Sequence, residues 1–297
     1  MTVLKLLEEI RTPILDQLFQ LVTYFGQELI IIGIICVLYW CFNKRFAYIL
    51  GFTYFTAGLI IQTLKITFRI PRPWVLDPTF HAVESAVPGA TGYSFPSGHT
   101  MGGTCLFAPL AYAARRRWVK LLCIAAFLMI GFSRLYLGVH TPKDVLVSMG
   151  ISLLISWLVW KYQSALLDSL KNTGIISLGM ALIAVLISIY AVTLLHSGVI
   201  DTHYAADCCK TAGAGLGFAL GYYLERKYLD FDPRNKSLFI QILKIFIGLG
   251  IALFLKEGLK LILGASIPMK MLQYFMVVLW VLFLYPYCFT KVLHKSA

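Results

Sequence analysis

Residues 174–195 read GIISLGMALIAVLISIYAVTLL, a run that contains no charged side chain. About 20 consecutive apolar residues in a helix span the hydrocarbon core of a bilayer, so this run decides the fold class. The stretch ELIIIGIICVLYWCF at residues 28–42 has a similar character. Of the 297 residues, 59% are hydrophobic and 13% are charged, whereas about a quarter are charged in a typical soluble domain. The sequence therefore predicts an all-α fold, a polytopic bundle of transmembrane helices.

Apolar stretches of helical length recur along the whole chain, and we expect each of them to cross the membrane. About nine spans are predicted, near residues 28–42, 46–67, 99–114, 118–138, 144–161, 174–195, 205–225, 237–256 and 272–290. The first could begin earlier, inside the stretch LFQLVTYFGQ.

The N-terminal residues 1–27 show a different pattern. Apolar residues recur there at helical spacing, at Leu4, Leu7, Ile10, Ile14 and Leu18. This predicts an amphipathic segment that lies in the membrane interface; it is too acidic and too weakly apolar for a cleaved signal peptide. We expect a core transmembrane domain at residues 28–195 and additional transmembrane helices at residues 196–297.

Lysine and arginine together number 26 against 14 acidic residues, a net charge of +12. This balance would suit nucleic acid, but the basic residues gather in short loops between apolar runs, as in Arg115-Arg116-Arg117. Membrane topology accounts for that distribution better, so we expect no nucleic-acid partner. The positive-inside rule places the N-terminus and the loops at residues 68–98 and 139–143 outside the cytoplasm. We expect the protein in the cell membrane.

The loop at residues 68–98 is unusually long. Loops of this length are uncommon in compact proteins and are usually functional or disordered. Its apolar residues Trp74, Val75, Leu76 and Phe80 suit a lid that faces lipid.

Two segments with unusual polar residues flank this loop. Lys65 and Arg72 lie about two helical turns apart, where Pro71 and Pro73 end the helix. Alone, they could be cations whose side chains extend to the membrane interface. After the loop comes Pro96-Ser97-Gly98-His99. Ser97 could cap the next helix, whose exposed N–H groups form a ready anion site, and Gly98 would allow close approach of a ligand.

A third segment carries Arg134, His140 and Asp144. Gly138 can break the helix before it, and Thr141-Pro142-Lys143-Asp144 has the form of a helix start, so Asp144 could simply be a capping residue. Asp144 is also within reach of His140, and a carboxylate on one imidazole nitrogen leaves the other free to attack.

The number of spans between these three segments brings them to one face of the membrane. Three cations and exposed helix-start amides favour a tetrahedral oxyanion, and phosphate fits. Two histidines in separate environments can supply a nucleophile and an acid. The seven cysteines form no CxxC or Cys/His pattern, and no carboxylate cluster suggests a metal. We therefore expect no metal and no cofactor.

These segments resemble the three signature motifs of the type-2 phosphatidic acid phosphatase superfamily. The matching residues are Lys65, Arg72 and Pro73, then Pro96, Ser97, Gly98 and His99, then Ser133, Arg134, His140 and Asp144. The superfamily includes lipid phosphate phosphatases, phosphatidylglycerophosphate and undecaprenyl-diphosphate phosphatases, glucose-6-phosphatase and the vanadium haloperoxidases. The resemblance covers residues 65–144, and its three motifs place a catalytic helical core at residues 28–161.

The resemblance implies a role for each residue. His140 would attack phosphorus to give a phosphohistidine, with Asp144 orienting it, and His99 would protonate the leaving oxygen and later activate water. The phosphate oxygens would be held by Lys65, Arg72, Ser97, Gly98 and Arg134. The residues by themselves leave open which histidine attacks, although the spacing of His140 and Asp144 favours His140.

The predicted function is metal-independent hydrolysis of a lipid phosphomonoester or diphosphate, such as phosphatidic acid, phosphatidylglycerophosphate or undecaprenyl diphosphate, at the extracytoplasmic face. The partners are the bilayer and the phosphorylated lipid. One alternative is a sugar-phosphate phosphatase like glucose-6-phosphatase, which the nine-span plan resembles, or a phosphotransferase. A non-enzymatic alternative is a lipid transporter or scramblase with an inert site.

Small residues recur at Gly213, Gly217 and Gly221. Such a stripe allows helices to pack closely, either within the bundle or between protomers of a homo-oligomer. Asp207 and Lys210 precede it near the membrane interface, where we expect them to pair with each other.

Overall fold

The computed structural model describes residues 1–234, 237–264 and 266–295, and within these ranges every regular element is a helix. The predicted all-α fold is confirmed. The chain forms two compact units. The first contains Met1–Ile32 and Ile60–Trp160, and the second contains Gly33–Leu59 and Lys161–Ala297. The division at residues 27 and 195 stays a prediction, because these units group segments by proximity in space.

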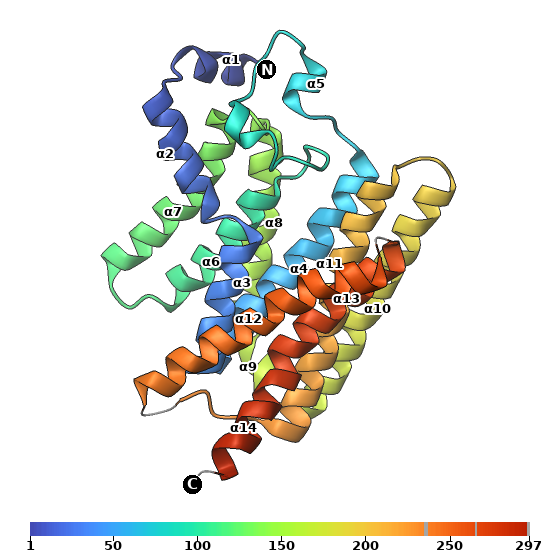
Figure 1. The fold of residues 1–297 in the computed structure, drawn as a ribbon. Coiled ribbons are helices and arrows are strands. Elements are labelled where there is room, and N and C mark those ends of the chain that lie inside the picture. Colours follow the sequence, from blue (N-terminus) through green and yellow to red (C-terminus); the bar gives the residue numbers. More distant parts are fainter. Residues whose placement is uncertain (235–236, 265, 296–297) are drawn as a thin grey trace. The chain divides into compact units, whose positions relative to one another are not determined.

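The first unit contains the N-terminal helices and most of the helices that carry the sequence motifs (Figure 1). They are α1 (Thr2–Glu9), α2 (Pro13–Tyr24), α5 (Pro73–Leu76), the 3-10 turn η2 (Glu84–Ala86), α6 (Gly98–Ala113), α7 (Arg117–Tyr136) and α8 (Pro142–Lys161). Two further helices, α3 (Glu28–Val37) and α4 (Lys44–Phe68), contribute residues to both units.

Close packing of α6 on α7 depends on a glycine. A Cβ atom on Gly103 would lie 2.7 Å from Cδ1 of Ile130, far inside van der Waals contact. The two helices therefore lie side by side with their connecting turn at one end. The start of α6 and the end of α7 lie together at the other end.

Gly138 turns the chain from α7 toward α8. Its φ of +73° is readily adopted only by glycine. A Cβ atom there would also lie 2.7 Å from Cζ of Phe80. The break expected at this residue is confirmed, and it places His140 between the two helices.

The second unit is a bundle formed by the C-terminal helices and the adjoining parts of α3 and α4. Its elements are the π-turns η1 (Leu38–Phe42), η3 (Glu225–Leu229) and η4 (Trp280–Leu284), and helices α9 (Gln163–Leu167), α10 (Leu170–His196), α11 (Thr202–Leu224), α12 (Leu238–Leu263), α13 (Ile267–Leu279) and α14 (Tyr285–Lys295).

The glycine stripe of α11 packs against other helical segments of this unit. A Cβ atom on Gly217 would lie 2.5 Å from the carbonyl oxygen of Phe275, and Gly213 and Gly221 likewise face Met271 and Leu282. Of the two roles expected for the stripe, the structure shows packing within the chain, so the stripe is not an open surface for a second protomer. The expected pairing of Lys210 with Asp207 is also confirmed, at 2.7 Å.

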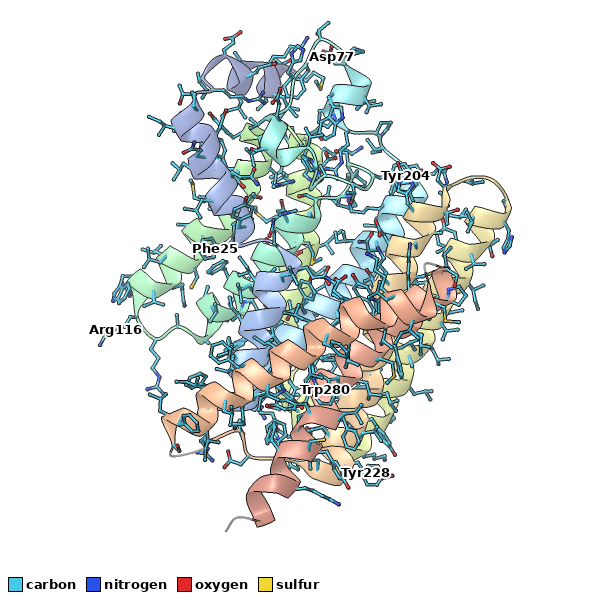
Figure 2. The ribbon with its side chains drawn as sticks, in the orientation of Figure 1. Phe25, Asp77, Arg116, Tyr204, Tyr228 and Trp280 are labelled. Carbon is cyan, nitrogen blue, oxygen red and sulfur yellow. The ribbon has the colours of Figure 1, made fainter. Side chains whose placement is uncertain are left out.

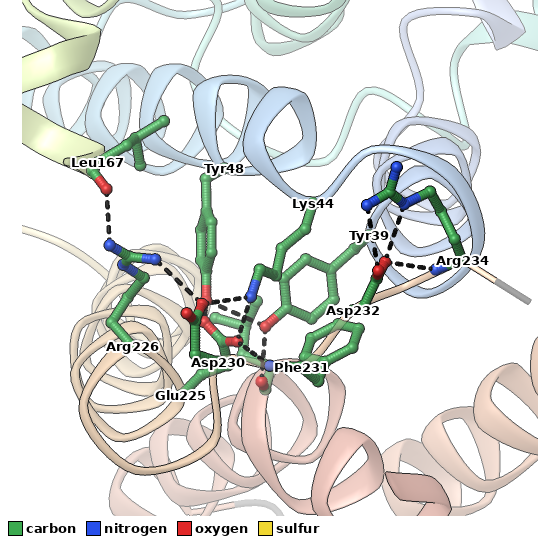
Figure 3. Close-up of polar contacts among 11 residues, drawn as sticks. Tyr39, Lys44, Tyr48, Leu167, Glu225, Arg226, Asp230, Phe231, Asp232 and Arg234 are labelled. Atoms are coloured by element: carbon green, nitrogen blue, oxygen red, sulfur yellow. Dashed lines mark hydrogen bonds and ion pairs between the residues drawn. The ribbon is translucent and has the colours of Figure 1, made fainter. Parts of the chain in front are cut away.

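A buried polar network ties the start of α4 to the turn after α11 (Figure 3). The Glu225 carboxylate is fully buried. It accepts hydrogen bonds from Lys44 Nζ at 2.8 Å and from the Tyr48 hydroxyl at 2.6 Å. A buried carboxylate is tolerated only when it is paired in this way, so these contacts fix this end of the second unit.

The prediction of nine spans is not confirmed. Helices lie at all nine predicted stretches, but within the described residues six are long and apolar enough to cross a membrane, or seven if a bent pair counts as one span. α6 has 16 residues and is therefore about 24 Å long, short of the roughly 30 Å hydrocarbon core. α11 is long enough, but its Gly- and Ala-rich sequence is less apolar, and much of it is buried inside the second unit.

The N-terminal segment is not one amphipathic helix. It is interrupted at residues 10–12, and α2 starts afresh with Thr12 as its cap and Pro13 in its first turn. Leu4 is buried, whereas Ile10, Ile14 and Leu18 are exposed, so the predicted apolar stripe does not form a single face. The bent pair mentioned above is α2 with α3–η1, inclined at 44°.

The loop at residues 68–98 was predicted to form a lid that faces lipid, but part of it is packed inside the first unit. Phe80 is buried, and Trp74 packs against a hydrophobic cluster that includes Phe19 of α2. Val75 and Leu76 are exposed. A lipid-facing role therefore stays available to only two of the four residues.

Candidate active site

The residues expected to form a site come from six places in the first unit. Lys65 lies in the last turn of α4, Arg72 precedes α5, Ser97 caps α6, and Gly98 and His99 are in its first turn. Arg134 lies in the last turn of α7, His140 in the following turn, and Asp144 in the first turn of α8. Hydrogen bonds and electrostatic interactions join them into one cluster.

The contact between Arg72 and His140 identifies the tautomer of His140. Nη1 of Arg72 lies 3.0 Å from Nε2 of His140. A guanidinium can only donate hydrogen bonds, so Nε2 must be the acceptor and carry the lone pair. The proton of the neutral imidazole then sits on Nδ1.

Asp144 faces that protonated nitrogen. Its Oδ2 lies 3.6 Å from His140 Nδ1, slightly beyond hydrogen-bond length. The same oxygen accepts hydrogen bonds from the Ser94 hydroxyl at 2.5 Å and from the Thr141 N–H at 2.8 Å. Asp144 is therefore both a capping residue of α8 and the carboxylate nearest the imidazole. The two interpretations of the sequence do not exclude each other.

The Pro96–His99 turn is anchored to α8. Ser97 N–H donates to the carbonyl oxygen of Asp144 at 3.1 Å, and the Ser148 hydroxyl donates to the Ser97 carbonyl at 2.6 Å. The Ser97 hydroxyl accepts a hydrogen bond from the N–H of Thr100, which is the capping expected of it. The amides of Gly98 and His99 belong to the first turn, where N–H groups have no partner within the helix.

The space around Gly98 suits an anion. A Cβ atom on Gly98 would meet no other heavy atom within 4 Å, so the backbone is open to a ligand at this position. The charges of Arg134, Arg72 and Lys65 all act on the nearby His99 imidazole. Within the described residues, no hydrogen bond to that imidazole is found, which leaves it available for proton transfer.

Two of the three cations of the site, Lys65 and Arg72, donate hydrogen bonds to the loop at residues 68–98, and the third, Arg134, donates to α2. Lys65 Nζ donates to the Tyr93 carbonyl at 2.6 Å, and Arg72 Nε donates to the Gly92 carbonyl at 2.8 Å. Arg134 is 2% exposed and donates from Nη1 to the Thr23 hydroxyl at 2.8 Å. The cluster thus buries three cations around one carboxylate, Asp144. Such an excess of positive charge is stable only with an anion nearby or at a considerable cost in free energy.

Burial lowers the pKa of His140 well below its ordinary value of 6.5, and the charges of Arg72, Arg134, Lys65 and His99 lower it further. A histidine with a lowered pKa stays neutral as the pH falls below 6.5. Nε2 loses its lone pair only when the pH falls through the lowered value.

We therefore expect the acid limb of kcat/KM to lie below pH 6.5. The measurement is phosphate release from a short-chain, monomeric phosphatidic acid, with the substrate's own titration determined by phosphorus NMR and divided out. Lys65→Met removes one of the cations that lower the pKa of His140, so it should move the acid limb to higher pH. An acid limb at or above 6.5 in the wild type would contradict this assignment.

Two polar residues of this region were not predicted from sequence. Ser94 lies three residues before the cap, within the stretch SFPSGHT, but nothing local indicates that its hydroxyl reaches a carboxylate 50 residues away. Thr23 lies in the segment expected to rest on the membrane surface. Within the described residues, no group of three His, Cys, Asp or Glu side chains could hold a metal.

Comparison of the sequence with known protein families identifies the family of this chain. The sequence pattern of the PAP2 superfamily matches residues 46–168, which include every residue of the cluster from Lys65 to Asp144. The pattern described as the PAP2 superfamily phosphatase transmembrane extension matches residues 209–296. The chain belongs to the PAP2 superfamily. With its apolar helices and this extension, it is a multi-pass integral membrane protein.

Several PAP2 proteins are similar to the chain. Undecaprenyl-diphosphatase BcrC of Bacillus subtilis is 34% identical over 111 residues, which are 37% of this chain and 54% of that protein. Phosphatidylglycerophosphatase B of the same organism is 25% identical over 161 residues, 50% of this chain and 76% of that protein. The crystal structure of Aquifex aeolicus LpxE superposes with a TM-score of 0.47 at 24% identity, covering 54% of this chain and 94% of that one. The chain thus spans about half the length of the first of these relatives.

Proposed function

We propose that this protein is an integral membrane phosphatase that hydrolyses a lipid phosphomonoester or diphosphate through a phosphohistidine, without a metal ion. The observation that carries the proposal is the contact between Arg72 and His140, which leaves a lone pair on Nε2. Around that nitrogen lie three buried cations, which suit the three equatorial oxygens of a phosphoryl group in transfer.

In the first step, Nε2 of His140 attacks phosphorus, and the bond from phosphorus to the lipid oxygen, or to the bridging oxygen of a diphosphate, breaks. The leaving oxygen takes a proton from His99. Arg72 moves its hydrogen bond from Nε2 to a phosphate oxygen, which exposes the lone pair. Asp144 accepts from the Nδ1–H and stabilises the positive charge that develops on the ring.

In the second step, His99 takes a proton from water as the water oxygen attacks phosphorus. The bond between nitrogen and phosphorus breaks, inorganic phosphate leaves, and Nε2 recovers its lone pair. The cations Lys65, Arg72 and Arg134 and the amides at the start of α6 hold the phosphoryl oxygens throughout. They supply positive charge that a metal ion provides in other phosphatases.

A lipid substrate is supported by the place of the site and by the relatives. The cluster lies at the ends of α4, α6, α7 and α8, where a phosphate headgroup would reach it from the membrane interface. The names of the similar proteins from Bacillus subtilis refer to undecaprenyl diphosphate and phosphatidylglycerophosphate. Both are phosphorylated lipids.

We place the site on the extracytoplasmic face of the cell membrane. Arg116 lies at the end of α7 away from Arg134 (Figure 2), beside two further arginines. The positive-inside rule assigns that end to the cytoplasm. The twenty residues of α7 then carry the site to the opposite side.

The proposal is tested by measuring phosphate release from purified protein in detergent micelles. The substrates are phosphatidic acid, phosphatidylglycerophosphate, undecaprenyl diphosphate and glucose 6-phosphate, each with a chelator and with orthovanadate. We expect release from at least one lipid, a rate that falls as detergent dilutes the lipid in the micelle surface, inhibition by vanadate and no effect of the chelator.

Other outcomes would support one of the alternative functions or contradict the mechanism. Faster turnover of glucose 6-phosphate than of every lipid would indicate a sugar-phosphate phosphatase. Transfer of the phosphoryl group to an added alcohol in preference to water would indicate a phosphotransferase. Loss of activity with the chelator would contradict the metal-independent mechanism. No release from any substrate, together with lipid movement between leaflets of reconstituted vesicles, would favour a scramblase.

A further inference from the structure

The break between α2 and α3 lies against the candidate site. α2 ends at Tyr24 and α3 begins at Glu28, and the two helices are inclined at 44°. Phe25 marks this bend in Figure 2. The segment precedes residue 46, where the match to the PAP2 superfamily begins. Neither the family pattern nor the three motifs assign it a role.

Thr23 contacts a phosphate-binding candidate directly. Its Oγ1 accepts the hydrogen bond from Nη1 of Arg134, and Thr23 is 1% exposed. Within the described residues this is the one hydrogen bond of the Arg134 side chain, and Nε of Arg134 is buried with no partner. Thr23 therefore supplies the hydrogen bond that fixes the direction of this buried guanidinium.

Gly26 brings the same segment onto the catalytic helix. A Cβ atom there would lie 2.5 Å from the carbonyl oxygen of His99 and 2.9 Å from Cγ2 of Ile130. On the other side, a Cβ atom on Gly102 would lie 2.6 Å from the carbonyl oxygen of Gly26. Backbone thus packs on backbone beside the proposed acid and one turn from Arg134.

α2 is also tied to the end of α7 on either side of Arg134. The rings of Phe19 and Tyr136 lie 4.3 Å apart, and those of Phe19 and Phe132 lie 5.4 Å apart. The Tyr136 hydroxyl donates to Asp16 at 3.0 Å. These contacts hold α2 in register with α7 and so keep Thr23 within hydrogen-bond distance of Arg134.

We propose that Thr23 is a positioning residue for Arg134, and that the α2–α3 break is part of the phosphate site. The active unit then extends beyond residues 46–168, which match the PAP2 superfamily, to the N-terminal segment. Thr23 touches no reacting atom; it aims the guanidinium so that its remaining N–H groups point at the phosphoryl oxygens. This inference rests on the proposed function, because Arg134 has a phosphate to bind only if the site takes one.

The test compares Thr23→Val with Thr23→Ser. Valine has the same shape but no hydroxyl, whereas serine keeps the hydroxyl. A hydrogen bond to a buried charged group is worth about 1.5–3 kcal/mol. We therefore expect Thr23→Val to raise both KM and the inhibition constant of orthovanadate at least about tenfold. Thr23→Ser should return both to within about twofold of the wild type.

A binding measurement accompanies the kinetics, namely the thermal stabilisation of each variant by orthovanadate. Thr23→Val should unfold near the wild-type temperature without vanadate but need about tenfold more vanadate for the same stabilisation. Gly26→Ala is a second variant, because its methyl group would push the segment away from His99 and weaken vanadate binding in the same way. Gly150→Ala is its control, since a Cβ atom there would meet nothing within 4 Å.

The outcomes separate this inference from the proposed function. A wild type that releases phosphate, beside a Thr23→Val variant with unchanged vanadate affinity and KM, overturns the role of Thr23 alone. Equal losses in Thr23→Val and Thr23→Ser also overturn it, because the hydroxyl would then be irrelevant. A wild type that neither releases phosphate nor binds vanadate overturns the proposed function and this inference together.

Discussion

His140→Ala is expected to lower kcat for phosphate release by about four orders of magnitude or more, as removal of a nucleophile does in other covalent mechanisms. The physical reason is the lone pair on Nε2, which the hydrogen bond from Arg72 identifies. Phosphate release would be measured with purified protein on whichever lipid the wild type turns over.

His196→Ala is the matched control, because His196 is an exposed histidine at the end of α10 in the second unit. It should retain full activity. Labelled substrate adds a direct readout: an acid-labile protein phosphate should form in the wild type and not in His140→Ala. Near-normal phosphate release by a folded His140→Ala variant would show that the attack comes from elsewhere, and His99 would then be the first residue to examine.

The proximity of the candidate site residues could be predicted from the sequence because it depends on local spacing and on the number of spans. Asp144 follows His140 by four residues across the start of α8, so their proximity depends on local structure. The cations at the ends of α4 and α7 reach the same place because the intervening helices reverse direction an appropriate number of times. This argument holds even though α6 is too short to count as a span by itself.

Contacts that depend on tertiary packing could not be predicted in the same way. The Ser94 hydroxyl reaches Asp144 only because the loop at residues 68–98 folds back on the start of α8. One signal was available for Thr23, however. Asp16, Phe19 and Thr23 are spaced three and four residues apart on one face of α2. Polar residues on a face that also carries an aromatic residue indicate packing against protein rather than lipid. The sequence prediction relied instead on Ile14 and Leu18, which are exposed.

Asp144→Asn is expected to lower kcat by about three orders of magnitude or more, comparable to the effect of this substitution in other enzymes that orient a histidine with a carboxylate. The carboxylate can only accept hydrogen bonds, so it favours the tautomer with the proton on Nδ1. The atom of Asp144 that accepts from the Thr141 N–H, Oδ2, is also the one that faces Nδ1 of His140. When the asparagine amide nitrogen takes that place, it donates to Nδ1, and the hydrogen bond from Thr141 is lost.

The imidazole proton would therefore move to Nε2, and the nitrogen that attacks phosphorus would have no lone pair. Because this is a change of tautomer and not of charge, raising the pH should not restore activity to Asp144→Asn. That pH independence separates the orienting role from simple capping, which would alter thermal stability and leave the chemistry intact. Asp77→Asn is the control: Asp77 pairs with Lys5 at 2.8 Å outside the site, and its loss should leave kcat unchanged. If Asp144→Asn kept kcat within about tenfold of the wild type, then Asp144 would act only as a cap and the proton on Nδ1 would be held by other means.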